Sequence, residues 1–168
     1  LECLGALCRA HGVLFCVDAI QSLGALPLDV QSCGADFLMA DGHKWLLAAE
    51  GCALFYVRAE RREQLQLRQF GWHMVEDAMD FSRSDWRPAA DARRFECGSA
   101  NMLGIHALSA SLGLLAEVGM PAVAERVLSM NLATLRNGSS FGAMIDDCLR
   151  HEVTAISPWR DQVASVGL

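Results

Sequence analysis

The fold class follows first from the stretch ADFLMADGHKWLLAAEGCALFYV, residues 35–57. It contains two short, continuous apolar runs, DFLMA (36–40) and CALFYV (52–57), separated by a polar turn. Runs of this length, bounded by charged residues or glycine, are typical of buried β-strands. The run VLFCV (13–17), which ends at Asp18, has the same character. Strands without a polar face predict a sheet that helices cover on both sides.

A helical period begins after Asn101. Apolar residues recur there at three- and four-residue steps, at Met102, Ile105, Leu108, Leu112 and Leu115. This spacing predicts a helix with one apolar face. Gly119 predicts its end and Pro121 the start of a second helix, which the pattern carries to Asn137.

The remaining segments are less regular. Residues 58–69 predict a surface helix or an irregular crossing. Residues 71–91 predict a long loop, and long loops in compact domains are often functional. Beyond residue 138 the pattern weakens, and only HEVTAI (151–156) predicts a further strand.

Length and composition are those of a globular protein. The chain has 168 residues, of which 52% are hydrophobic and 20% charged, enough for one ordinary domain with a sizeable core. The formal net charge is -6 without a basic tract, which argues against nucleic acid as a partner. No apolar segment is long enough to cross a bilayer, so we expect no membrane partner. The seven cysteines show no zinc-like spacing, which predicts no metal site and free thiols in a reducing cytoplasm.

Polar side chains follow two of the predicted strands. Asp18 and Gln21 come after the first, and His43 and Lys44 come after the second. Ligands of open parallel sheets bind at the carboxyl ends of the strands, so these residues form a candidate site. Each also has a simpler interpretation: a helix cap for Asp18, a satisfied loop histidine for His43, a solvated charge for Lys44.

Lys44 stands out because it is the only lysine, in a chain that otherwise uses arginine. The two residues are nearly interchangeable on a solvated face. Lysine can lose its proton, whereas arginine does not, and a neutral amine attacks carbonyl groups. The single lysine therefore favours a covalent role; the alternative is a low count that arises by chance from codon bias.

Three motifs in sequence give a more specific indication. VDAIQSLG (17–24), ADFLMADGHKW (35–45) and RRFECGSAN (93–101) resemble the class V aminotransferase family. These pyridoxal-phosphate enzymes include cysteine desulfurases, selenocysteine lyases and isopenicillin N epimerase-like proteins. The resemblance implies an α/β fold: part of the aspartate-aminotransferase-like large domain, with a mixed, mostly parallel sheet flanked by helices.

The resemblance also implies a role for each polar residue of the candidate site. Lys44 matches the lysine that holds the cofactor as an imine, and Asp18 the aspartate that pairs with the protonated pyridine nitrogen. Gln21 matches the residue that hydrogen-bonds the phenolic oxygen of the cofactor. His43 matches a residue that contacts its phosphate. Ser99 matches a hydroxyl that reaches the phosphate of the neighbouring subunit, which implies a homodimer.

The family pattern also predicts how the chain is organised. Residues 1–118 would belong to the large domain, and residues 119–168 to a linking helix and the incomplete start of a small C-terminal domain. Family members are longer at both ends, so we expect this chain to be an internal piece of a longer protein. Cysteine desulfurases carry serine or threonine, a phosphate ligand, at the position of Asp41. A carboxylate pointing at the phosphate would repel it, so either Asp41 turns away or the phosphate is held differently.

Three functional hypotheses follow. The first is a fragment of a pyridoxal-phosphate enzyme that acts on an amino acid by transamination or by removal of sulfur or selenium. The second is a truncated, non-catalytic paralogue that keeps the motifs and binds a partner. The third, an unrelated doubly wound domain, leaves the positions of Ser99 and Asn101 unexplained. The sequence does not distinguish between substrates.

Overall fold

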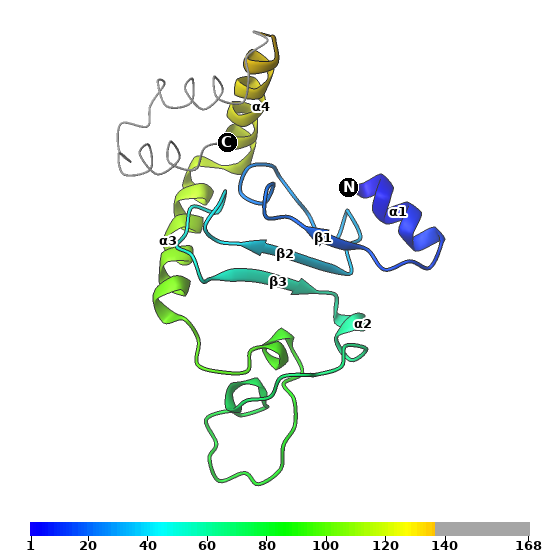
Figure 1. The fold of residues 1–168 in the computed structure, drawn as a ribbon, viewed down its shortest axis with the longest axis vertical. Helices are drawn as coiled ribbons and strands as arrows, with labels where there is room; N and C mark the ends of the chain where they lie inside the picture. The colour runs from blue at the N-terminus through cyan, green and yellow to red at the C-terminus, as the bar shows by residue number, and fades with distance from the viewer. Residues whose placement is uncertain (137–168) are drawn as a thin grey trace, which may run out of the picture. The chain divides into compact units, whose positions relative to one another are not determined.

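A computed structural model describes residues 1–136 of the chain (Figure 1). In chain order the helices and strands are α1 (Glu2–Ala10), β1 (Cys16–Asp18), β2 (Phe37–Asp41), β3 (Ala53–Val57), α2 (Ala59–Arg62), α3 (Met102–Val118) and α4 (Met120–Arg136). Two 3₁₀ turns, η1 (Trp72–Met74) and η2 (Ala92–Phe95), lie between α2 and α3. The chain divides into two compact units, residues 1–123 and 124–168, and the first contains the whole sheet. The predicted strand at 151–156 lies outside the described residues.

The three predicted strands are present. β2 and β3 begin one residue later than predicted. β1 is shorter than the predicted run, because Val13 and Leu14 remain exposed and the ladder begins only at Cys16. Phe15 instead donates its backbone N–H to the carboxylate of Asp36, 2.9 Å away.

The sheet is mixed, with the order β1-β2-β3. β1 is parallel to β2, so that Asp18 lies beside Met39, and β2 is antiparallel to β3. The carboxyl ends of β1 and β2 therefore share one edge, and Figure 1 shows that the end of β2 points toward α3. This is the edge at which the candidate site was predicted.

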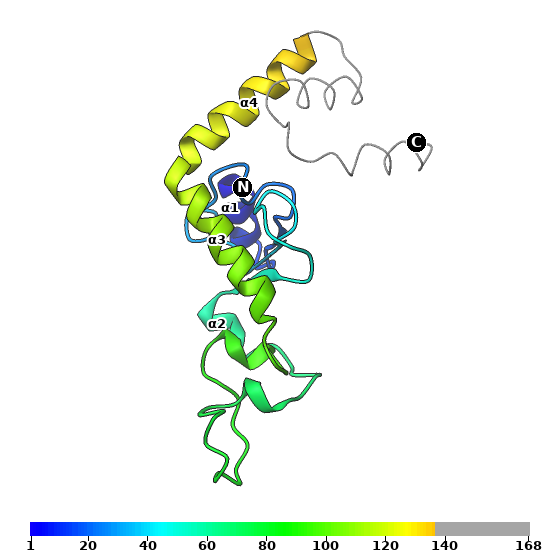
Figure 2. The same ribbon diagram turned by 90° about the vertical axis from the view of Figure 1, so that its left-hand side faces the viewer.

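One face of the sheet is well covered. Val17, Leu38 and Ala40 are buried together with Leu108 and Leu115 of α3, and Figure 2 shows α3 running beside the strands. The opposite face carries Cys16, Met39 and Phe55, which stay at least partly accessible in the described residues. Phe55 contacts Phe95 of η2 edge to face, with ring centroids 5.7 Å apart.

The buried stripe of α3 differs from the predicted one. Leu108 and Leu115 are buried as expected, but Met102 and Ile105 are largely exposed and the other buried positions are Gly104 and Ser111. Small residues let the helix approach the sheet closely: a Cβ at Gly104 would lie 3.0 Å from the Cβ of Cys52. The close approach of α3 to Cys52 therefore selects a buried stripe that hydrophobic periodicity alone does not reveal.

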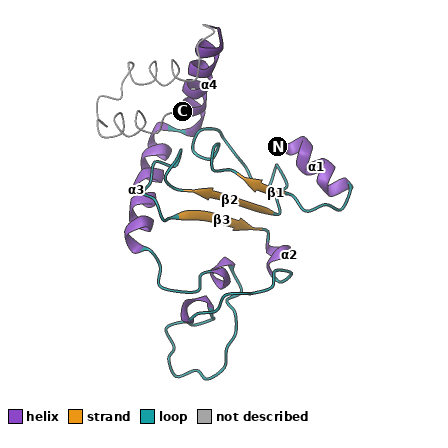
Figure 3. Cartoon of the chain, viewed as in Figure 1, coloured by secondary structure: helices purple, strands orange, loops and turns teal. Residues whose placement is uncertain are grey.

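The segment between α2 and α3 is mostly irregular, as predicted (Figure 3). Residues 59–62 form one helical turn, and residues 71–91 form a loop with one 3₁₀ turn. An isolated antiparallel bridge joins Val75 to Pro88, and Met74 is fully buried beneath it. Buried Arg94 pairs with Glu63 and ties the end of this segment back to the residues after α2.

Asp36 joins the starts of β1 and β2 to the end of β3. Its carboxylate accepts from the Phe15 N–H, and from Arg61 Nε at 2.9 Å, while Arg58 Nε lies 3.7 Å away. Burial opposes ionisation of this carboxyl, but the hydrogen bonds from Phe15 and Arg61 outweigh it and hold its pKa below the ordinary value. Asp36 therefore stabilises the fold as a carboxylate.

Asp36→Asn should lower the free energy of unfolding by about 2 kcal/mol at neutral pH, since buried donors lose a charged acceptor. Partial exposure of both arginines keeps the loss from being larger. Because the folded-state pKa is depressed, this stabilisation is present above about pH 4 and is lost as the pH falls through the folded-state pKa. Urea unfolding at pH 7 and pH 3 measures both effects, with Glu60→Gln on α2 as a control. Equal losses for the two variants at pH 7 would contradict the prediction.

Candidate functional site

Lys44 lies on a closed turn that follows β2. Gly42 begins this turn, with its N–H donating to Cys52 O at 2.8 Å and its carbonyl accepting from the Ala48 N–H at 2.9 Å. A side chain would not fit there, because a Cβ would lie 2.8 Å from Cys52 O. Lys44 O accepts from the Leu47 N–H at 3.0 Å, and Leu47 adopts a left-handed backbone with φ 58. The backbone thus holds Lys44 in a defined position after the strand.

The segment that follows β1 packs against this turn. Asp18 is exposed, and its Oδ1 accepts from the Ile20 N–H at 3.1 Å, so it forms a local turn and does not cap a helix. Gly24 has φ 95 and lies so close to the lysine turn that a Cβ would be 2.3 Å from Trp45 O. This contact brings the segment of Asp18 and Gln21 next to the turn of Lys44.

Two carboxylates point to the same face of the sheet. The register pairs Asp18 with Met39, two residues before Asp41, so both lie on the accessible face and are roughly 7 Å apart along the strand direction. Asp41 turns toward His43, whose Nδ1 lies 3.0 Å from Asp41 Oδ1. The interaction with the His43 imidazole lowers the pKa of the Asp41 carboxyl. The carboxylate of Asp41, at the position where cysteine desulfurases carry serine or threonine, therefore faces His43.

The groups that a cofactor would use have few competing partners. Lys44 is half-buried, and its ammonium makes no hydrogen bond or ion pair with any residue in the range 1–136. The amide of Gln21 is exposed and likewise has no hydrogen-bond partner within that range. The candidate site therefore presents an unpaired amine and an unpaired amide at one sheet edge.

Asn101 connects the third motif to the lysine turn. Its Oδ1 accepts from the Gly104 N–H at 3.0 Å and caps α3, while its Nδ2 donates to Gly51 O at 2.9 Å. Asn101 closes the motif RRFECGSAN, but the sequence assigned it no role of its own. An asparagine directly before a helical run is a typical N-cap, and this signal could have identified it. Ser99 is exposed, and no hydrogen bond joins it to Lys44 in the part of the chain that the structure describes.

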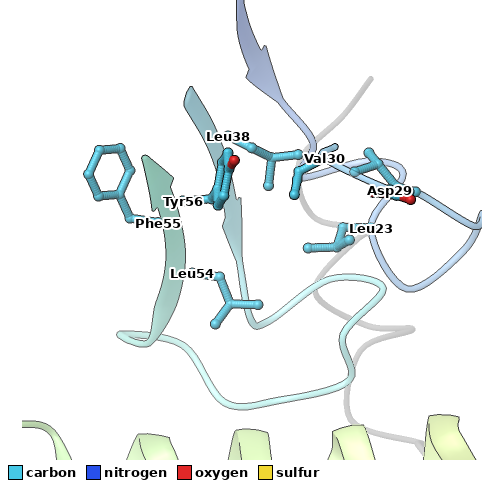
Figure 4. A pocket seen from close by; sticks show the side chains of 8 residues that line it. Leu23, Asp29, Val30, Leu38, Leu54, Phe55 and Tyr56 are labelled. Atoms are coloured by element: carbon cyan, nitrogen blue, oxygen red, sulfur yellow. The ribbon is translucent and has the colours of Figure 1, made fainter. Parts of the chain in front are cut away.

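An apolar pocket of about 440 Å³ lies on the covered face of the sheet and contains none of the predicted site residues (Figure 4). Its lining consists of Leu23, Leu28, Asp29, Val30, Leu38, Leu54, Phe55 and Tyr56. Figure 4 shows Leu38, Leu54 and Tyr56 facing the residue 23–30 segment, whereas Phe55 points away. The pocket and the Lys44 site are therefore separate features.

Other kinds of site can be assessed within the same residues. The six cysteines of residues 1–136 are free thiols. This range holds no group of three or more histidine, cysteine, aspartate or glutamate side chains that could bind a metal ion. Within it, no single helix is long and apolar enough to cross a membrane, and α3 with residues 120–130 reaches that length only across a break.

Comparison with known proteins gives a consistent family assignment. The family model described as aminotransferase class-V matches residues 1–138. Curated relatives include an uncharacterized aminotransferase of Bacillus subtilis, 32% identical over 127 residues (76% of this chain, 33% of the relative). A probable cysteine desulfurase of Pseudomonas putida is 35% identical over 136 residues (81% and 33%). A kynureninase of Deinococcus radiodurans is 31% identical over 137 residues (81% and 33%).

Solved structures give the same result. A cysteine desulfurase from Thermococcus onnurineus matches with a TM-score of 0.71 and 27% identity, covering 80% of this chain and 33% of the other. The desulfurase CsdA of Escherichia coli matches with a TM-score of 0.66 and 27% identity, covering 80% and 32%. The chain spans about a third of the length of the curated relatives it matches.

Proposed function

The chain belongs to the class V aminotransferase family and has part of the α/β fold of its cysteine desulfurases, and on this premise we propose that it carries the lysine part of a pyridoxal-phosphate site. The observation that carries the proposal is the sheet edge where Asp18 and the only lysine lie on neighbouring turns. The proposed activity is that of a pyridoxal-phosphate-dependent enzyme acting on an amino acid.

The residues at this edge suit the chemical groups of pyridoxal phosphate. An amine without a carboxylate partner in residues 1–136 suits the aldehyde. An exposed carboxylate at the end of β1 suits a protonated ring nitrogen. His43, next to Gly42 on the turn, offers a ring nitrogen for the phosphate. Asp41 faces the imidazole of His43, with its Oδ1 3.0 Å from Nδ1.

Each residue would then have a distinct task. Bound at this edge, pyridoxal phosphate would supply an electron sink for a carbanion at the α-carbon of an amino acid. Lys44 would hold the cofactor through Nζ, and in its neutral form that atom would later accept the α-proton of the substrate. Asp18 would keep the ring nitrogen protonated, and Gln21 would donate to the phenolic oxygen. His43 would contact the phosphate.

The wider setting is also proposed. Transamination or cysteine desulfuration is the reaction type that the family supports, in a homodimer where Ser99 reaches the phosphate of the neighbouring subunit. The free thiols suit a reducing compartment, and we place the protein in the cytoplasm. Residues 1–118 form part of the large domain in this proposal, and residues 119–168 begin the small one.

The test uses the fact that Lys44 is the only lysine. The 168-residue chain is incubated with pyridoxal phosphate, the visible absorbance is recorded, and the adduct is reduced with borohydride and mapped by mass spectrometry. A saturable adduct on Lys44 supports the proposal. If neither this chain nor a longer form containing it labels at Lys44, the enzyme proposal is wrong and the non-catalytic paralogue is favoured.

A further inference from the structure

Asp41 and His43 form a pair beside the proposed lysine anchor. Asp41 Oδ1 lies 3.0 Å from His43 Nδ1 in an ion-pair contact and has no hydrogen-bond partner among the described residues, and both side chains are about one-third exposed. The pair is held from the backbone, because Gly42 between them is hydrogen-bonded on one side to Cys52 and on the other to Ala48. The turn therefore fixes the backbone positions from which the two side chains meet.

A carboxylate in this position has a definite effect on the imidazole. Asp41, like an ordinary aspartate, is ionised at neutral pH, and the contact with His43 lowers its pKa further. An ionised carboxylate offers only lone pairs, so a proton on Nδ1, 3.0 Å away, is favoured over a second lone pair facing the carboxylate. The tautomer is thereby chosen, and Nε2 is the ring nitrogen left for another ligand.

Nε2 in this state suits a phosphate group. The second pKa of a phosphate monoester is about 6, so one proton can be shared between Nε2 and a phosphate oxygen whichever of the two carries it. A carboxylate cannot itself donate to phosphate. We propose that Asp41 is a positioning residue that fixes the His43 tautomer and so presents Nε2 to the phosphate of the cofactor, an inference that rests on the proposed function.

The engagement of Asp41 with His43 also concerns Lys44. A carboxylate paired with the ammonium group would hold Lys44 in its charged form. Asp41 instead contacts His43, and no acidic side chain of residues 1–136 pairs with Lys44. The pair thus serves the phosphate end of the site without blocking the amine.

The first test reads the tautomer directly and needs no cofactor. Two-bond proton–nitrogen correlation spectra of the histidine-labelled 168-residue chain, with His43 assigned from His43→Gln, report which ring nitrogen carries the proton. We expect the Nδ1–H form in the native chain and a change toward Nε2–H in Asp41→Ala. Asp41→Asn, which keeps an acceptor oxygen, should retain much of the Nδ1–H form. An unchanged His43 tautomer in Asp41→Ala would overturn the proposal.

The second test isolates the phosphate. Binding of pyridoxal phosphate is compared with binding of pyridoxal, which has the aldehyde and the ring but no phosphate. Asp41→Ala should weaken pyridoxal phosphate about tenfold and leave pyridoxal unchanged, whereas Asp80→Ala, an exposed aspartate hydrogen-bonded to Ser82, should affect neither. Equal weakening of both compounds would refute a phosphate-directed role.

The two proposals fail in different ways. If the native chain forms no adduct with either compound, the proposed function fails and the phosphate role of Asp41 fails with it, while the tautomer spectra still decide whether Asp41 positions His43. If Lys44 labels normally but neither spectra nor phosphate selectivity respond to Asp41→Ala, only the role of Asp41 is refuted. If Asp41→Ala does not fold, the test uses the native chain and Asp41→Asn. An Nε2–H form of His43 in the native chain would then refute the role of Asp41.

Discussion

Replacing Lys44 by arginine will reduce the borohydride-trapped pyridoxal phosphate adduct to background. Arginine keeps the positive charge and the hydrogen-bonding capacity of lysine, but it does not become neutral and cannot attack the aldehyde. The fold should be unaffected, because the Lys44 ammonium has no partner within residues 1–136, and we expect the free energy of unfolding to change by less than about 0.5 kcal/mol. Absorbance titration and urea unfolding measure the two quantities on the same samples.

The control for this experiment moves the lysine to another place. In the double variant Lys44→Arg with Arg68→Lys, the chain again has one lysine, now on an exposed part of the segment after α2. Labelling should be weak and should not saturate, because no neighbouring groups hold the cofactor there. If the double variant labels with the affinity of the native chain, any accessible amine forms the adduct. The proposed site at Lys44 would then be refuted.

Gly24→Ala should disrupt the site from the opposite side. The added Cβ would lie 2.3 Å from Trp45 O and 2.6 Å from Trp45 C, and the backbone at Gly24 already has φ 95. Because the obstructing atoms are backbone, the two segments must separate, and we expect a loss of about 2–4 kcal/mol in unfolding free energy. Adduct formation at Lys44 should fall as well, since this contact brings Asp18 and Lys44 together.

Gly12 provides a matched control for the backbone effect. It also has a positive φ, 64, but a Cβ there would meet nothing within 4 Å. Gly12→Ala should therefore show only the conformational cost, about 1 kcal/mol, with normal adduct formation. If the two alanine variants unfold alike, the close approach of Gly24 to Trp45 is not a source of stability.

The strands could be predicted from sequence because each is a compact apolar run with clear ends. The way in which the strands pair could not be predicted from sequence. The charged cluster around Asp36 depends on that pairing. Asp36 meets Arg58 because β2 and β3 pair with Phe37 opposite Val57, a register that no local pattern encodes. The same applies to α3, where contact with Cys52 selects Gly104 as a buried position.

For the candidate site, the sequence predicted which strand ends carry the polar residues but not the contacts between their side chains. The positions of Asp18 and Lys44 at adjacent strand ends follow from the order of the motifs, and the structure places them on neighbouring turns. From the sequence, either Asp41 turns away from a phosphate or the phosphate is held differently. The sequence could not indicate His43 as the partner, because that contact depends on how the backbone bends at Gly42. The roles of all five site residues remain predictions: Asp18, Gln21, His43, Lys44 and Ser99.

The parallel pairing of β1 with β2 has a consequence for the order of folding events. The turn of Lys44 is local and can form as soon as residues 42–52 are available. Asp18 reaches its place only when β1 joins β2 across the intervening residues 19–36, and non-local pairing of this kind is slow compared with turn formation. A growing chain therefore positions Lys44 before Asp18, and the proposed site is complete only once β1 has joined β2.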